Sequence, residues 1–265
     1  MTELVDVAPG VAVATADIWA TTSTIVAGDD GTCLVVDPGV TVADLAGLAD
    51  ALEARGWRVT AGFSTHPHWD HVLWSVRLGA APRWATPRAC AVADETREVI
   101  QRDTDADAPG HDHALTGRLT ALPDAVANLP WSGPRGLTLP YRAHCPGSAA
   151  LLLPELGVLC AGDLLSDREV PLLDLDSPDP VGDHVAALDV LEGAIRDHGV
   201  RVLIPGHGTV VDAAGALSRA EDDRAYLRSL MRGGPVEDAR LADPWVAAQH
   251  ERQLLWARGG RPPAA

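Results

Sequence analysis

The chain has 265 residues, of which 46% are hydrophobic, so it can bury a sizeable core as one large domain or two small ones. Its formal net charge of -16, with no lysine, opposes binding to nucleic-acid phosphates or anionic lipid headgroups, so neither a nucleic-acid nor a membrane partner is expected. Glu3 and Asp6 stand where a secretory signal needs basic residues, and no run approaches the ~20 apolar residues of a membrane span, so a cytoplasmic location is expected.

The first hundred residues predict a β-β-α-β-α-β-α order. Strands are expected over 11–16, 23–26 and 32–36, with a turn at 29–31. A helix capped by Thr41 follows, because Leu45, Leu48 and Leu52 recur at helical spacing until Gly56. The pattern then predicts a strand over 58–64, a second helix after residue 71, a strand over 83–85 and a helix over about 87–101.

The second half predicts another strand-rich region followed by helices. The segment 103–113 is interpreted as a surface loop, in which His111 and His113 are expected to be exposed. Strands are expected over 137–143 and as a hairpin over 149–161, then a helix over 181–198 and a strand over 200–204. No linker divides the chain, which predicts a single domain over 1–265. Residues 212–258 form its helical extension, and 259–265 are expected to be a disordered tail.

The segment 65–71 holds three histidines and a carboxylate directly after the strand predicted over 58–64. Residues i and i+2 of an extended chain point the same way, so His66 and His68 can share one metal ion. Asp70 and His71 fall one turn further on and can serve a second ion a few ångströms away. Neutral imidazole and carboxylate are ligands that zinc takes at catalytic sites, so the segment predicts a metal site.

Three further candidate ligands each follow a predicted strand. His144 precedes a Pro-Gly turn, Asp163 ends an apolar run in which an unpaired charge would be costly, and His207 stands between two glycines. With the first cluster they make five histidines and two aspartates, the complement for two metals with one bridging carboxylate.

In the order of these motifs, from Asp37 to His207, the chain resembles the metallo-β-lactamase superfamily. The resemblance implies an α/β (α+β) fold, an αββα sandwich of two mixed β-sheets flanked by helices. It also implies two Zn2+ ions per chain, with Fe or Mn as alternatives. The implied roles of the residues are a first metal held by His66, His68 and His144, a second held by Asp70, His71 and His207, a bridge at Asp163, and orientation of the site by Asp37.

The same resemblance implies a metal-dependent hydrolase, in which a bridging hydroxide attacks and Asp70 acts as the catalytic residue that orients it. An ester, lactone or thioester of a small molecule is the favoured substrate. A β-lactam is less favoured, because the chain has no lysine to hold the drug's carboxylate and no export signal. Phosphodiester cleavage, an iron persulfide dioxygenase and an inactive binding scaffold remain alternatives.

Substrate clues in the sequence are few. Trp69 and Trp74 are candidates for an apolar pocket wall beside the metals, with core packing as the alternative for each. The segment 164–180 is expected to form another wall, and it and 103–113 are candidate lids. His184, His198 and His250 are expected at the surface. The C-terminal helices can form a homodimer surface or cover the core.

Overall fold

The computed structural model describes residues 3–124 and 128–259. Its α-helices are α1 (Val42–Ala54), α2 (Pro87–Glu95), α3 (Arg97–Asp107), α4 (Pro180–Asp197), α5 (Ala213–Arg232) and α6 (Pro244–Ala257). Its strands are β1 (Val5–Ala8), β2 (Val11–Thr15), β3 (Thr22–Ala27), β4 (Thr32–Val36), β5 (Arg58–Phe63), β6 (Arg83–Ala85), β7 (Thr120–Ala121), β8 (Leu137–Pro140), β9 (Ala149–Leu153), β10 (Val158–Cys160), β11 (Val202–Ile204) and β12 (Val211–Asp212).

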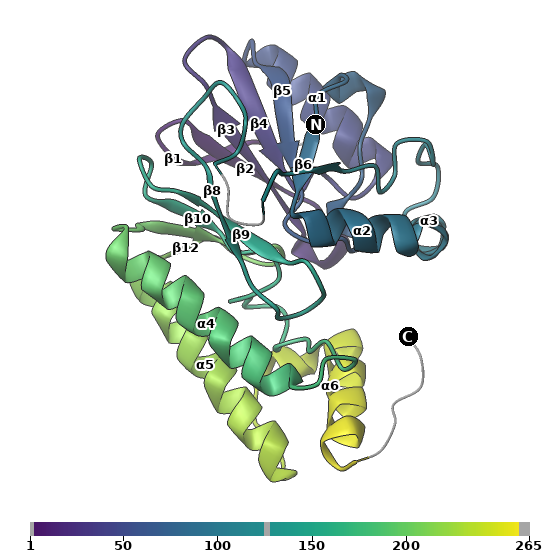
Figure 1. Ribbon diagram of the computed structural model, residues 1–265, viewed down its shortest axis with the longest axis vertical. Coiled ribbons are helices and arrows are strands. Elements are labelled where there is room, and N and C mark those ends of the chain that lie inside the picture. Colours follow the sequence, from purple (N-terminus) through teal and green to yellow (C-terminus); the bar gives the residue numbers. More distant parts are fainter. Residues whose placement is uncertain (1–2, 125–127, 260–265) are drawn as a thin grey trace.

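The strands form two mixed sheets. The first sheet has the order β1-β2-β3-β4-β5-β6-β7, antiparallel as far as β4 and parallel from β4 onward. The second has the order β12-β11-β10-β9-β8, in which only β10 and β11 are parallel. The purple and blue N-terminal half of Figure 1 carries the first sheet, and the teal and green half below it carries the second, against which α4 and α5 lie.

Alternating side chains build the layers. In β4, Cys33 and Val35 join the core beneath α1, whereas Leu34 and Val36 join the core shared by the two sheets. Because side chains of a strand alternate between its faces, a strand buried on both sides has the continuous apolar run seen here. A third core joins the second sheet to α4 and α5, which completes the αββα sandwich expected from the resemblance.

Local signals account for α1. The Thr41 side chain accepts from the backbone N–H of Asp44, and Asp44 accepts from the backbone of Thr41, which is a capping box. Leu45, Leu48 and Leu52 are buried along one face, as their spacing predicts.

The helix expected after residue 71 is absent, and this prediction is wrong. Only 3-10 turns occur there, at Trp69–His71 and Val76–Leu78. The run Val72, Leu73 and Trp74 between them is buried at three consecutive positions, which suits an irregular segment pressed into the core better than an amphipathic helix. The helix expected over 87–101 is instead two helices, α2 and α3, which meet at Thr96. The loop expected over 103–113 is wrong as far as Asp107, because α3 continues to that residue with Thr104 buried on its inner face.

The last helices, α5 and α6, form their own apolar cluster with the segment 170–175. They occupy the predicted extension, and the expected tail lies, apart from Gly259, outside the described residues. Among the helices described, none is long and apolar enough to cross a membrane.

Candidate metal centre

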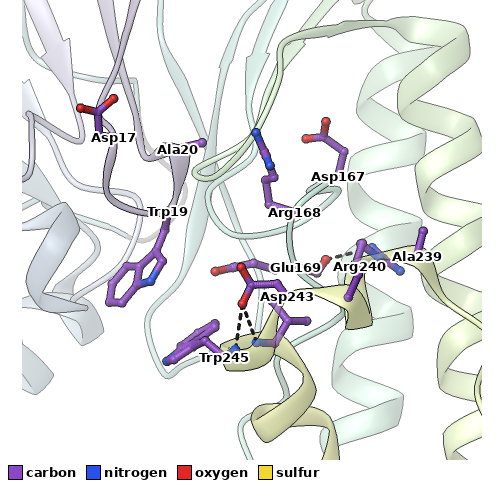
Figure 2. Close-up of a pocket in the computed structure, with 12 residues that line it drawn as sticks. Asp17, Trp19, Ala20, Asp167, Arg168, Glu169, Ala239, Arg240, Asp243 and Trp245 are labelled. Atoms are coloured by element: carbon purple, nitrogen blue, oxygen red, sulfur yellow. Dashed lines mark hydrogen bonds between the residues drawn. The ribbon is translucent and has the colours of Figure 1, made fainter.

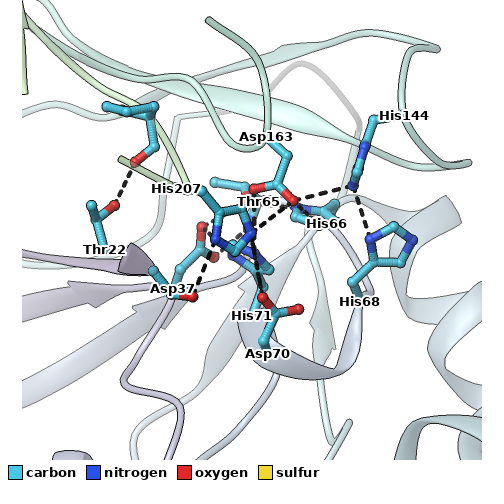
Figure 3. Close-up of polar contacts among 12 residues, drawn as sticks. Thr22, Asp37, Thr65, His66, His68, Asp70, His71, His144, Asp163 and His207 are labelled. Atoms are coloured by element: carbon cyan, nitrogen blue, oxygen red, sulfur yellow. Dashed lines mark hydrogen bonds and ion pairs between the residues drawn. The ribbon is translucent and has the colours of Figure 1, made fainter. Parts of the chain in front are cut away.

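Seven histidine and aspartate side chains converge where the two sheets meet (Figure 3). Four of them come from the segment after β5 in the first sheet. The others follow strands β8, β10 and β11 of the second sheet. The seven are the predicted ligands His66, His68, Asp70, His71, His144, Asp163 and His207.

The first group contains His66, His68, His144 and Asp163, whose ligand atoms all lie within 4.8 Å of one another. His144 Nε2 is 3.2 Å from Asp163 Oδ2 and 2.9 Å from His68 Nδ1. His66 Nε2 is 3.3 Å from the same Asp163 oxygen. Three imidazoles and one carboxylate oxygen thus face a common point, as a tetrahedral ion requires.

The second group contains Asp70, His71 and His207. Asp70 Oδ2 lies 3.3 Å from His71 Nε2 and 3.4 Å from His207 Nε2. Asp163 reaches this group too, with Oδ1 3.3 Å from His71 Nε2 and Oδ2 3.2 Å from His207 Nε2. Asp163 therefore contacts both groups, which is the position of a bridging ligand.

The donor set fits divalent ions. Within the described residues, His66 Nε2, Asp70 Oδ2 and Asp163 Oδ1 are buried without a hydrogen bond. Buried polar atoms are costly when they have no partner, and these three all face the common centre. Imidazole nitrogen with carboxylate oxygen is the set that zinc and related ions prefer.

The electrostatics of the site show how the carboxylates are balanced without metal. Burial raises the pKa of Asp163, but the surrounding imidazoles, led by His207, outweigh it and hold that pKa well below its usual range. Burial lowers the pKa of His207, but attraction to Asp163 and Glu169 raises it to about 10. The pKa of His71 is likewise raised well above its usual value, mainly by Asp163 and Asp70 against the effect of burial. The buried carboxylates thus raise the proton affinity of the imidazoles that face them, and a metal ion binding here would have to displace those protons.

Asp37 orients the ligands from behind. Its Oδ2 lies 3.1 Å from His71 Nδ1, and it accepts hydrogen bonds of 2.8 Å and 2.7 Å from the Thr65 backbone N–H and hydroxyl. Thr65 Oγ1 in turn lies 3.0 Å from His66 Nδ1. Asp37 has φ 47, a left-handed conformation that non-glycine residues adopt at some cost. The carboxylate therefore positions one imidazole in each group.

His207 is held by both sheets. Thr21 Oγ1 lies 3.2 Å from His207 Nδ1, and Ser166 donates to the His207 carbonyl at 2.8 Å. A Cβ on the preceding Gly206 would stand 2.0 Å from Asp163 Oδ1, so only glycine lets this loop approach the carboxylate.

Residues 16–211 match the family described as the metallo-beta-lactamase superfamily. The chain belongs to this superfamily. Among solved structures, a metallo-beta-lactamase family protein from Thermus thermophilus is similar with a TM-score of 0.70 and 22% identity, over 97% of this chain and 98% of that one. A beta-lactamase domain protein from Burkholderia ambifaria has a TM-score of 0.68 and 17% identity, over 97% and 88%.

The DIM-1 metallo-beta-lactamase has a TM-score of 0.57 and 16% identity, over 84% of this chain and 97% of that one. At these identities the likeness shows the metallo-β-lactamase fold alone. No curated protein matches the sequence.

Two tryptophans of this superfamily member were candidates for a pocket wall. Trp74 packs against Gly62, and its indole donates to the Gly79 carbonyl at 2.9 Å, so it belongs to the core. Trp69 is 9% exposed and packs edge-on against Trp19, with ring centroids 5.7 Å apart. Trp19 lines a pocket, and Trp69 contacts Trp19 without lining that pocket itself.

The remaining histidines in the described residues belong to neither ligand group. His111 contacts the Val40 carbonyl at 2.8 Å, and His113 pairs with Asp105 at 3.0 Å. His184 and His250 were expected at the surface, and this was wrong, because they are 0% and 7% exposed. Each lies on the inward side of its helix, α4 or α6, which the charged residues around them in sequence do not reveal.

Glu169 is the residue at this superfamily site that the sequence did not single out. It is 6% exposed, and one of its oxygens lies within 4.8 Å of ligand atoms of Asp163 and His207. Burial raises the pKa of its carboxyl to about 7. In sequence it is one of many acidic residues in the segment 164–180, so composition alone indicates a solvated side chain.

Proposed function

We propose that this protein is a metal-dependent hydrolase that holds two zinc-type ions and cleaves an ester, lactone or thioester of a small molecule. The observation that supports this most is the position of Asp163, whose carboxylate lies within 3.3 Å of imidazoles from both ligand groups. A carboxylate shared in this way serves paired ions.

The chain's own residues have separate tasks in this proposal. His66, His68 and His144 hold the first ion, and His71 and His207 hold the second together with Asp70. When bound, such a pair supplies a water of lowered pKa and Lewis-acid stabilisation of the reacting oxygen.

Asp70 is the proposed catalytic carboxylate. Its Oδ2 is buried, has no hydrogen bond among the described residues, and lies between two imidazoles of the second group. An oxygen so placed can orient the attacking water and accept its proton. Burial raises the pKa of Asp70, but His71 outweighs burial and lowers it well below the usual value, so the carboxylate is ionised and can act as an acceptor at neutral pH.

The size and charge beside the site support a small substrate. A pocket of about 560 Å³ adjoins the ligands, within the range of small-molecule sites. With a net charge of -16 and no lysine, the chain offers little attraction to a polyanionic substrate. These features favour an acyl substrate over a nucleic-acid phosphodiester.

His68→Ala and Asp70→Ala are expected to remove metal-dependent hydrolysis while leaving a folded protein. His113→Ala is the matched control, because His113 lies in the loop away from the ligands. Turnover of lactone, thioester, β-lactam and phosphodiester substrates is measured together with the metal content per chain.

Unchanged turnover in either variant would refute the assignment. Activity confined to phosphodiesters would reverse the substrate order. One iron per chain with oxygen uptake would instead support the persulfide dioxygenase alternative.

A further inference from the structure

A pocket of about 560 Å³ lies beside the second ligand group (Figure 2). Its walls come from the loop after β2, from the segment that follows Asp163, and from the start of α6. Trp19 connects it to the centre, with its ring centroid 6.3 Å from that of His207. Glu169 connects it again, since its carboxylate is within 4.8 Å of a His207 nitrogen. The pocket and the surroundings of His207 therefore share the Trp19 and Glu169 side chains.

Two indoles form one side of the pocket. Trp19 and Trp245 stack with ring centroids 5.4 Å apart and an interplanar angle of 30°. Trp19 and the next residue, Ala20, both have left-handed backbone conformations, with φ 51 and 53. Such strained residues persist only where surrounding structure supports them, and here the strain presents the indole to the pocket.

A buried carboxylate faces the indoles. Figure 2 shows the Glu169 side chain reaching toward the side of the pocket where Trp19 and Trp245 lie. Glu169 is 6% exposed, and its carboxylate lies within 4.8 Å of a His207 nitrogen, whose positive charge attracts it. Because Glu169 also lines the pocket, its carboxylate can pair with a cationic ligand on that side.

The charge around the pocket is negative. Three more carboxylates line it, from Asp17, Asp167 and Asp243, of which Asp167 is already paired with Arg219 at 3.5 Å. Of its two arginines, Arg240 is already matched, because it lies 2.6 Å from Asp223 and 2.8 Å from Asp238. The exposed Arg168 is the other. The unmatched charge of the lining therefore favours a cation.

We propose that this pocket binds an ammonium group of the substrate, between the indoles of Trp19 and Trp245 and the carboxylate of Glu169. Aromatic faces together with a carboxylate are the chemistry that recognises alkylated ammonium ions. The substrate class is then a small ester, thioester or lactone that carries a positive charge close to its scissile bond. The reaction rests on the proposed function, whereas ammonium binding does not.

Binding can be tested without turnover by comparing choline with 3,3-dimethylbutan-1-ol, a neutral molecule of the same shape. Calorimetric titration is carried out on the metal-loaded and the metal-free protein. Choline is expected to bind at least about tenfold more tightly than the alcohol. Glu169→Gln and Trp245→Ala are each expected to weaken choline binding about tenfold and to change alcohol binding little.

Glu155→Gln is the matched control, since Glu155 lies in the turn between β9 and β10, away from this pocket. This variant is expected to bind choline as the wild type does. Equal affinity for choline and the alcohol, or an unchanged preference in Glu169→Gln, would overturn the proposal. Loss of bound metal in Glu169→Gln would make Glu169 a metal ligand and overturn it as well.

Turnover separates this proposal from the function on which it rests. Acetylthiocholine is expected to have a kcat/KM at least about tenfold higher than its neutral 3,3-dimethylbutyl analogue. Choline binding without any hydrolysis would refute only the proposed function. Hydrolysis that does not distinguish the two thioesters would refute only the ammonium site.

Discussion

Replacing Asp37 by Asn tests whether the carboxylate behind the ligands controls metal affinity. Asn has the same shape and tolerates the left-handed φ of 47, so the backbone is expected to be retained. Its amide cannot satisfy all the present donors, because Oδ2 faces both His71 Nδ1 and the Thr65 hydroxyl, at 3.1 Å and 2.7 Å. Loss of a carboxylate that orients a ligating imidazole costs about 10–100-fold in metal affinity, which is about 1.4 to 2.7 kcal/mol.

Zinc affinity is measured by competition with a chromophoric chelator, and folding by circular dichroism. Asp30→Asn is the matched control, because Asp30 also accepts hydrogen bonds, from the Thr32 backbone and hydroxyl, but lies in the turn before β4. A zinc affinity of Asp37→Asn equal to that of the control, with the fold intact, would refute the positioning role.

Two further predictions concern the loop at the ligands and a buried histidine. Gly206→Ala is expected to lower zinc affinity at least about 100-fold, because its Cβ would stand 2.0 Å from Asp163 Oδ1. Gly193→Ala is the control, because Gly193 faces open space on α4. It is expected to leave zinc affinity unchanged and to stabilise the fold by up to ~1 kcal/mol. Equal zinc affinities in Gly206→Ala and Gly193→Ala would contradict this account. His184 is fully buried, and burial lowers its pKa from 6.5 to about 3. Because the folded pKa lies below the unfolded one, the wild type loses stability as pH falls below 6.5, by about 2 kcal/mol at about pH 5. His184→Leu is expected to lack this part of the acid sensitivity. The free energy of unfolding is measured by urea titration at about pH 7 and about pH 5, and an equal loss of stability in variant and wild type would show the reasoning to be wrong.

The sequence predicted best what short-range chemistry decides. A continuous apolar run after a turn predicted β4, and Thr41 with three spaced leucines predicted α1. The convergence of the seven candidate ligands was predictable for a related reason. Each stands in a segment that follows a strand, and the ends of neighbouring strands share one edge of a sheet.

The sequence predicted poorly what depends on distant partners. Glu169 is buried because the loop that carries it folds over His207, and nothing near it in sequence signals that contact. Trp19 faces the pocket because it stacks on Trp245 from the other end of the chain. The run Val72–Trp74 is irregular because the 3-10 turn of the ligand segment precedes it and its own side chains pack into the core beneath α1. These tertiary contacts override any local helical pattern.

The ligands of each group are contributed by both sheets, so a bound ion is also a tie between two halves of the chain. The two halves must dock before either group of side chains is complete, so the proposed metal binding would be a late event in folding. Any ion that binds only the docked form adds to stability according to its free concentration relative to its dissociation constant. The free energy of unfolding of this protein would then rise with the free zinc concentration. A chelator would weaken the contact between the two sheets as well as abolish the proposed hydrolysis.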